Sequence, residues 1–221
     1  MNGAALWAMI AAMGVYQGIN PPMGWLYAVW CGLERGSARA VLSGTGSFAA
    51  GHYLSMLALA IPAALAFAFV HIDPLLTVPW FGIAMIMFGF YKLVRPHHPR
   101  LLARIPPSRP MSWSFAMAAL HCGSPIMMLA PLASGLAPFT IHGADPATGA
   151  RLFWFAGAAL LVSGVMAASH FATATAIALF VHRRLGLRAL TRVWIDLDAG
   201  WAVIFMLMGA MALDMSPGGV M

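Results

Sequence analysis

The stretch GINPPMGWLYAV, residues 18–29, lies inside an apolar segment that runs from residue 4 to residue 33. Proline has no backbone N–H to donate, and its ring clashes with the preceding helical turn, so Pro21 and Pro22 should interrupt a helix at this point. The interruption frees backbone groups that lipid does not satisfy. We therefore expect the break to face protein or water.

The whole chain is very apolar. Its 221 residues are 62% hydrophobic and only 8% charged, and the mean hydropathy is +0.83. This composition excludes a soluble globule and predicts an integral membrane protein. The N-terminus has no basic region followed by a short apolar core and a cleavage site, so we expect Met1 onward to be mature chain.

Six apolar runs have about the 20 residues that are needed to cross a bilayer. They cover residues 4–33, 40–70, 75–94, 111–138, 152–181 and 199–213. Eleven of the 12 Lys and Arg residues fall in loops on one side of this arrangement, with only Arg151 opposite. The positive-inside rule makes that side cytoplasmic and predicts that both termini are non-cytoplasmic. The same rule accounts for the net charge of +6, so nucleic acid is not an expected partner.

The sequence also contains an internal repeat. The triplet GHY at residues 51–53 and the triplet SHF at residues 169–171 are displaced by 118 residues. Each is followed, 30 residues after its histidine, by a glycine, Gly82 in the first case and Gly200 in the second. Two equal intervals around similar triplets indicate that the chain consists of two related halves.

The proline breaks repeat as well. Asn20-Pro21-Pro22 in the first span has a counterpart in Gly123-Ser124-Pro125 of the fourth. We therefore predict an all-α membrane protein with six transmembrane helices in a single domain, residues 1–221. The first repeat covers residues 1–94 and the second residues 111–215. Three helices in each repeat give the two repeats opposite orientations.

Three stretches resemble a known superfamily. GTGSFAAGHYLSMLALAIPAAL, GIAMIMFGFYKLVRPHHP and SFAMAALHCGSPIMMLAPL are similar to the second, third and fourth helices of the lysine exporter superfamily, and most of all to its nickel/cobalt exporters and cytochrome c biogenesis thiol transporters. The resemblance covers most of the chain and implies six helices in two inverted triplets and a transport role. The signature ligands of those two branches do not carry over. Residues 17–22 lack the His-Asp-His set of the nickel exporters. The thiol transporters have one cysteine beside a proline in each half, whereas here Cys122 precedes Ser124-Pro125 and the first half has only Pro21 and Pro22.

Polar side chains inside the spans are candidates for function, because they are costly to bury in hydrocarbon. In inverted-repeat transporters, broken helices form the solute site near the middle of the bilayer. The predicted transport pathway consists of Gln17, Asn20, Pro21, Pro22, Ser124, Pro125 and Thr173. The predicted metal ligands are His52, His170, His121 and Cys122.

Imidazole and thiolate in a methionine-rich chain suit soft ions such as Cu(I) or Zn(II). Neighbours on a helix point about 100° apart, so at most one of His121 and Cys122 should join His52 and His170. The alternative for each histidine is a neutral ring that forms a hydrogen bond to a neighbouring helix.

We expect a transporter-like, multi-pass protein of the bacterial inner (cytoplasmic) membrane. Its solute would be a soft transition-metal ion, with Cu, Zn, Ni and Fe as candidates, or a small metal or thiol complex. Two other classes stay open: an accessory or assembly subunit of a larger membrane complex, and a haem- or metal-binding membrane redox protein. Besides lipid, a second copy of the chain or a larger complex is the expected partner. The motifs of hydrolases, phosphate-binding enzymes and metalloproteases are missing, so we predict no catalytic residues.

Overall fold

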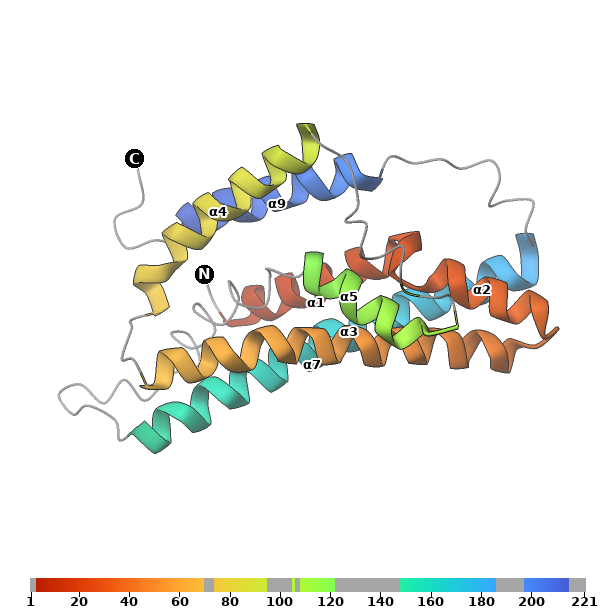
Figure 1. The fold of residues 1–221 in the computed structure, drawn as a ribbon, viewed down its shortest axis with the longest axis horizontal. Coiled ribbons are helices and arrows are strands. Elements are labelled where there is room, and N and C mark those ends of the chain that lie inside the picture. The colour runs from red at the N-terminus through yellow and green to blue at the C-terminus, as the bar shows by residue number, and fades with distance from the viewer. Residues whose placement is uncertain are drawn as a thin grey trace.

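The computed structural model describes residues 3–69, 74–94, 105, 108–121, 148–185 and 197–214. Within these ranges the chain forms helices and turns and contains no strand (Figure 1). The predicted all-α fold class is confirmed at this level.

The first half contains α1 (Gly3–Ile19), the 3-10 turn η1 (Pro21–Met23), α2 (Trp25–Glu34), α3 (Ala38–Phe69) and α4 (Pro74–Val94). The second half contains α5 (Pro110–His121), α7 (Thr148–Phe180), the π-helical turn η3 (Val181–Leu185) and α9 (Leu197–Asp214).

Two stretches are long and apolar enough to cross a membrane, Ala38–Ala66 within α3 and Leu152–Leu185 through α7 and η3. The shorter apolar helical stretches among the described residues are Trp7–Ile19, Pro79–Val94 and Ala202–Asp214. At a rise of 1.5 Å per residue, the 32 residues of α3 extend over about 48 Å, more than the roughly 30 Å of a hydrocarbon core. The count of six crossings stays a prediction.

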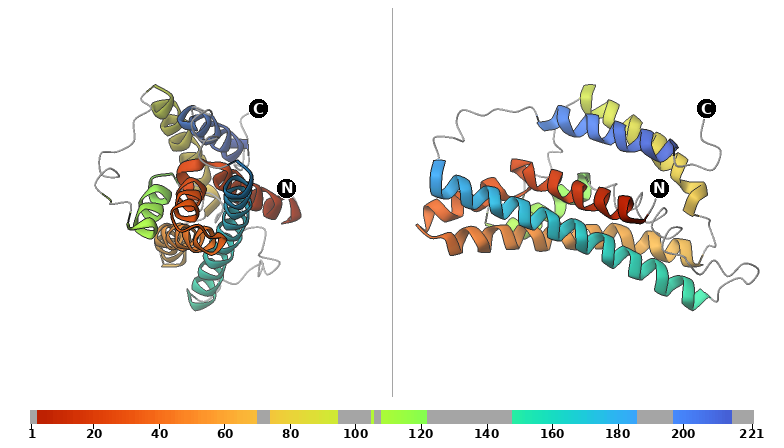
Figure 2. Two further views of the ribbon diagram at one scale, coloured as in Figure 1. Left: turned by 90° about the vertical axis from the view of Figure 1, so that its right-hand side faces the viewer. Right: turned by 180° about the vertical axis from the view of Figure 1, so that it is seen from behind.

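The helices form a bundle and a second layer (Figure 2). In the bundle, α3 packs along α7, α1 lies against α7, α5 lies against α3, and α2 contacts both long helices. α4 and α9 pack against each other and form the second layer. Each long element therefore pairs with an element of the other half of the chain.

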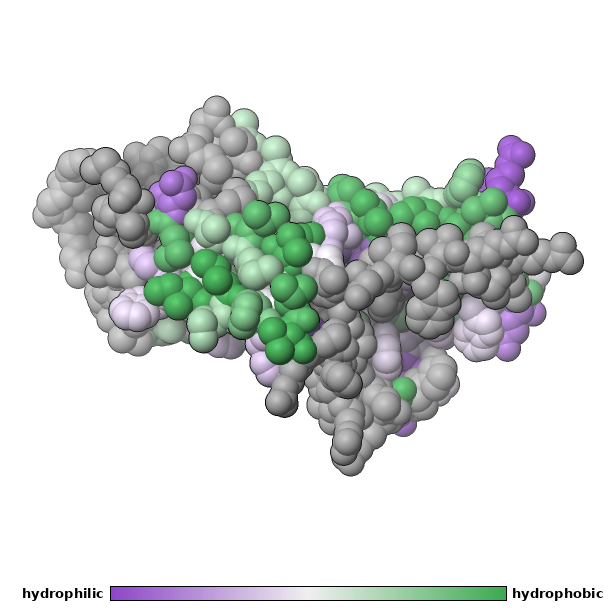
Figure 3. Space-filling model, turned by 90° about the horizontal axis from the view of Figure 1, so that it is seen from above, coloured by the Kyte–Doolittle hydropathy of each residue, from purple (hydrophilic) through white to green (hydrophobic). Residues whose placement is uncertain are grey.

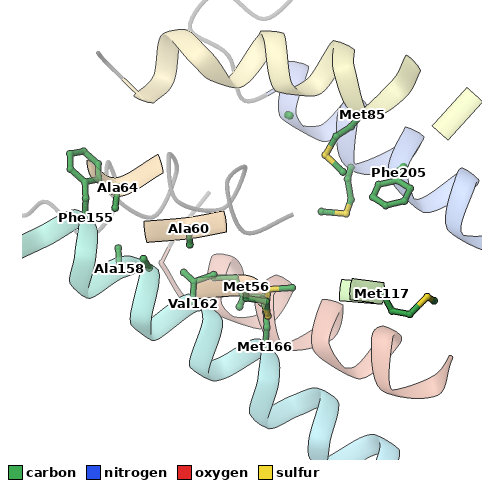
Figure 4. Close-up of a cluster of buried hydrophobic side chains, with 14 of the residues drawn as sticks. Met56, Ala60, Ala64, Met85, Met117, Phe155, Ala158, Val162, Met166 and Phe205 are labelled. Carbon is green, nitrogen blue, oxygen red and sulfur yellow. The ribbon is translucent and has the colours of Figure 1, made fainter. Parts of the chain in front are cut away.

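Small residues and large ones alternate where α3 meets α7. Ala60 and Ala64 of α3 face Val162 and Phe155 of α7 in one buried cluster (Figure 4). Facing small and large side chains lets two straight helices interdigitate without voids. More than half of the buried residues of this cluster come from α3 and α7.

Glycines bring α4 and α9 together. A Cβ added at Gly82 would lie 2.8 Å from the carbonyl oxygen of Gly209, and one at Gly89 would lie 2.6 Å from that of Ala202. The missing side chains allow the two backbones to touch, as in close-packed membrane helices. Gly200, which the 30-residue interval equates with Gly82, lies elsewhere, because its nearest neighbour is the hydroxyl of Tyr16.

Large apolar side chains cover the outside of the described helices. Trp80, Phe153 and Met87 are 74%, 73% and 67% exposed. Seen from the side of α4 and α9, hydrophobic residues gather over the surface (Figure 3). Only 39% of the apolar window in each of the two long helices is buried, so the remaining part of each window is partly or fully exposed.

Candidate functional site

The two histidines of the repeated triplets meet at the centre of the bundle. His52 lies near the middle of α3, and His170 lies on α7. Their ring centroids are 4.5 Å apart and the rings meet edge to face, with an interplanar angle of 66°. The exposed fractions are 0% for His52 and 1% for His170. The structure therefore brings together the two histidines on which the sequence prediction was centred.

The interruption expected from the prolines lies beside this pair. α1 ends at Ile19, and α2 does not begin until Trp25. Within the turn, the N–H of Met23 donates to the carbonyl of Asn20 (3.0 Å). Gly24 has a φ of +131°, and a Cβ at this position would lie 2.7 Å from the ring of Phe48, so the junction requires a glycine.

The break frees carbonyl groups, and side chains satisfy two of them. The indole N–H of Trp25 donates to the carbonyl of Ile19 (2.8 Å). The Nε2 of His170 lies 2.9 Å from the carbonyl oxygen of Met23. Because a carbonyl oxygen only accepts, Nε2 must carry the proton, and Nδ1 of His170 therefore keeps its lone pair. The helix break thus fixes the tautomer of one histidine.

Several buried polar atoms in this region have no hydrogen-bond partner among the protein atoms. They are both ring nitrogens of His52, Nδ1 of His170, Oδ1 of Asn20 and the hydroxyls of Ser55 and Ser163. A buried polar group without a partner costs about 1–3 kcal/mol. Native structures carry few such groups, so each of them needs an explanation.

The polar residues follow one pattern in both long helices. Each histidine has a hydroxyl residue seven positions before it and another three positions after it. These residues are Thr45, His52 and Ser55 on α3, and Ser163, His170 and Thr173 on α7. Of these four hydroxyl residues only Thr173 was predicted from the sequence, although the interval that relates the histidines also relates Ser55 to Thr173 and Thr45 to Ser163. Thr45 also accepts a hydrogen bond from Thr175 across the α3–α7 contact (3.1 Å).

The first helix of each half makes a matching contact with the long helix of the other half. On α1, Gly14 packs directly against the carbonyl of Met166. On α5, the hydroxyl of Ser114 donates to the carbonyl of Phe48 (2.6 Å). Phe48 and Met166 are separated by the same interval as the two histidines. In each case a small residue covers one of the two carbonyls that this interval relates.

The four predicted pathway residues of the first half lie in two places, at the contact of α1 with α7 and in the turn η1. Gln17 and Asn20 are buried on either side of Gly18, whose backbone packs against Thr173 and the carbonyl of His170. Pro21 lines an apolar cavity of about 540 Å³ at the side of the bundle, and Pro22 belongs to the same turn. The cavity is lined by Pro21, Leu26, Tyr27, Trp30, Phe48, Ile105, Pro110 and Trp113.

The second-half residues are less fully described. Cys122, Ser124 and Pro125 lie outside the described residues, and His121 is described only as the last residue of α5. Within the described part of the chain, no three His, Cys, Asp or Glu residues come close enough to hold a metal ion. The histidines therefore form a pair there, and the four-residue ligand set stays a prediction. The chain matches no protein family, no curated protein and no solved structure in the comparisons.

Proposed function

We propose that the protein is a membrane transporter that moves a soft transition-metal ion through a site between its two halves. The observation that carries the proposal is the buried pair of His52 and His170, which has three ring nitrogens without a partner where the two longest helices cross. Neutral imidazole is a common ligand of transition metals. The metal ion is the cargo in this proposal, not a resident cofactor.

The outward-facing surface supports placement in a membrane. Trp80 and Phe153 are exposed by more than 70% each, and the long helices bury less than half of their apolar windows. Water would penalise this surface, whereas lipid is its natural solvent. The basic ends support one cytoplasmic face, because the end of α2, the start of α3 and η3 come together where Gly32 contacts Val41 and His182. These ends carry Arg35, Arg39, Arg183 and Arg184.

The packing pairs support two inverted repeats. α1 contacts α7 and α5 contacts α3, while α3 pairs with α7 and α4 with α9. His52 and His170 are equivalent positions of the repeat, and they touch each other. A residue contacts its own equivalent only where a two-fold axis passes between them. In inverted-repeat transporters, that axis lies in the membrane plane and the solute site lies on or near it.

The environment of His170 supports a role as a metal ligand. Histidines that bind metals usually donate their other ring N–H to a carboxylate or a backbone carbonyl, which orients the ring. His170 donates from Nε2 to the carbonyl of Met23 and leaves Nδ1 for a ligand. The break at Pro21 and Pro22 supplies that carbonyl, so the prolines act on the site through the backbone.

A second candidate is an accessory subunit of a larger membrane complex. The hydrogen bond from His170 to Met23 favours it, because the same bond also holds two helices together. The redox alternative has less support from the geometry. Two imidazoles that ligate one haem lie on opposite sides of its plane, whereas these rings meet at 4.5 Å.

Elemental analysis of the purified protein tests the proposal. The protein is isolated in mild detergent without chelator and compared with His52→Ala/His170→Ala and with His182→Ala, a histidine outside the pair. We expect near-stoichiometric Cu, Zn, Ni or Fe in the natural protein and in His182→Ala, and loss of the metal in the double variant. An unchanged metal content in a folded double variant would contradict the proposed site.

A further inference from the structure

We propose that the site selects a monovalent soft cation, Cu(I), and that the thioethers of Met56 and Met166 complete the ligand set begun by the two histidines. The inference rests on the proposed function and names the ion. It follows from the position of the two methionines and from the charge of the surrounding helices.

The two methionines lie one helical turn from the histidines. Met56 follows His52 by four residues on α3, and Met166 precedes His170 by four residues on α7. Residues four apart occupy the same face of a helix. Because α3 and α7 are antiparallel, as the bond between Thr45 and Thr175 requires, both methionines lie on the same side of the histidine pair.

Burial and contact agree with this placement. Met56 and Met166 are both fully buried and belong to one cluster. They lie side by side in the close-up view (Figure 4). The positions one turn to the other side of the histidines are Phe48 and Ala174, which offer no ligand atom. The positions of Met56 and Met166 therefore both lie to one side of the pair.

The methionines do not follow from the repeat. The interval that relates His52 to His170 equates Met56 with Ala174 and Met166 with Phe48. Each half thus contributes one thioether from a position where the other half has none. The antiparallel packing brings these two unrelated positions to one level, one helical turn from the histidine pair.

Charge decides between monovalent and divalent ions. None of the six acidic residues of the chain lies in α1, α3 or α7. Imidazole and thioether are neutral ligands, so a divalent ion would bring two uncompensated charges into the centre of an apolar bundle, and the cost of burying an ion rises steeply with its charge. Thioether and imidazole together suit Cu(I). His170 would bind through Nδ1, since Nε2 donates to Met23.

Titration of the purified protein with Ag⁺ and, separately, with Zn²⁺ tests the inference. Ag⁺ is a soft monovalent ion that stays in one oxidation state. Bound metal is counted after desalting in the natural protein, in Met56→Leu/Met166→Leu, and in Met85→Leu, a matched variant of a buried methionine on α4. Leucine conserves volume, so each variant should fold. A Cys31→Ser variant removes the buried thiol of α2 as a competing site.

We expect one Ag⁺ for each chain of the natural protein, of Met85→Leu and of Cys31→Ser. Loss of an outer-shell partner weakens metal sites by about 10–100-fold, so loss of two direct ligands in the double variant should weaken Ag⁺ binding by at least about tenfold. X-ray absorption of the Cu(I)-loaded protein should show sulfur neighbours that disappear in the double variant. This second measurement does not depend on affinity.

The other outcomes separate the inference from the proposed function. Zn²⁺ bound as tightly as Ag⁺, with both ions bound unchanged by Met56→Leu/Met166→Leu and lost in His52→Ala/His170→Ala, would overturn the Cu(I) site and leave the histidine site standing. Equal effects of the double variant and Met85→Leu would identify the methionines as packing residues and overturn the inference. Binding of neither ion would overturn both.

Discussion

Two pairs of helices, α3 with α7 and α4 with α9, each join one half of the chain to the other, but the residues between the helices differ. α3 and α4 belong to the first half of the chain, and α7 and α9 belong to the second. In the second pair, Gly82 and Gly209 bring two backbones into contact, and the helices close completely. In the first, His52 and His170 hold unpartnered polar atoms at the crossing point. A pair of packed helices can therefore bring two backbones into contact or enclose polar side chains, according to the residues at its centre.

The largest effect on the free energy of unfolding is expected from a larger residue at the glycine contact between α4 and α9. In Gly209→Ala, the new methyl group would overlap the backbone of Gly82, which has no flexible atom to move away. We expect a loss of about 1–3 kcal/mol in the free energy of unfolding, measured by thermal unfolding in detergent. Gly164→Ala is the matched control, because a Cβ there meets nothing within 4 Å. It should gain up to about 1 kcal/mol. Equal effects would show that the α4–α9 contact contributes nothing.

A medium effect is expected where α5 meets α3. Ser114→Ala removes the buried hydroxyl that donates to the carbonyl of Phe48 and leaves that carbonyl with one partner fewer. The free energy of unfolding should fall by about 1 kcal/mol. Ser112→Ala, at an exposed position of the same helix, should change it by less than about 0.5 kcal/mol. Indistinguishable variants would contradict the contact between the two helices.

The smallest effect on the free energy of unfolding is expected at Ser55, a polar residue of α3. The hydroxyl of Ser55 is buried and has no partner among the protein atoms, so its removal in Ser55→Ala relieves a desolvation cost. The metal-free protein should keep its stability within about 0.5 kcal/mol or gain slightly. A loss as large as that of Ser114→Ala would mean that the hydroxyl makes a stabilising bond in the folded protein. A smaller loss of stability in Ser55→Ala than in Ser114→Ala would therefore indicate that the hydroxyl of Ser55 is left for a ligand.

The parts of the fold that depend on local chemistry were predictable from the sequence. Pro21 and Pro22 cannot continue a helix, so the interruption after Ile19 follows from the residues themselves. The equal intervals around His52 and His170 predicted that the two histidines are equivalent positions of two related halves, and the structure places their rings in contact. Helical structure of the apolar runs follows in the same way from composition and length.

Other features depend on contacts between distant residues. The bond from His170 to Met23 joins residues 147 positions apart, and no local pattern predicts which carbonyl of the break receives it. The interval that relates Gly82 to Gly200 does not say which glycine each one packs against, and in the structure Gly82 lies against Gly209. Ser55 and Ser163 could be predicted from the 118-residue interval, because it relates Ser55 to Thr173 and Ser163 to Thr45. The partners of His170 and Gly82 are set by tertiary packing, which sequence intervals alone do not describe.

Transport into sealed vesicles tests the central claim most directly. The natural protein, His52→Ala/His170→Ala and His182→Ala are each reconstituted in lipid vesicles, and Ag⁺, Zn²⁺ or Ni²⁺ is added outside. The metal inside is counted after the external ion has been removed. We predict that the natural protein and His182→Ala accumulate at least one of the ions above the level of protein-free vesicles, whereas the double variant does not. Equal uptake by a folded double variant would contradict the claim that the ion passes through the histidine pair.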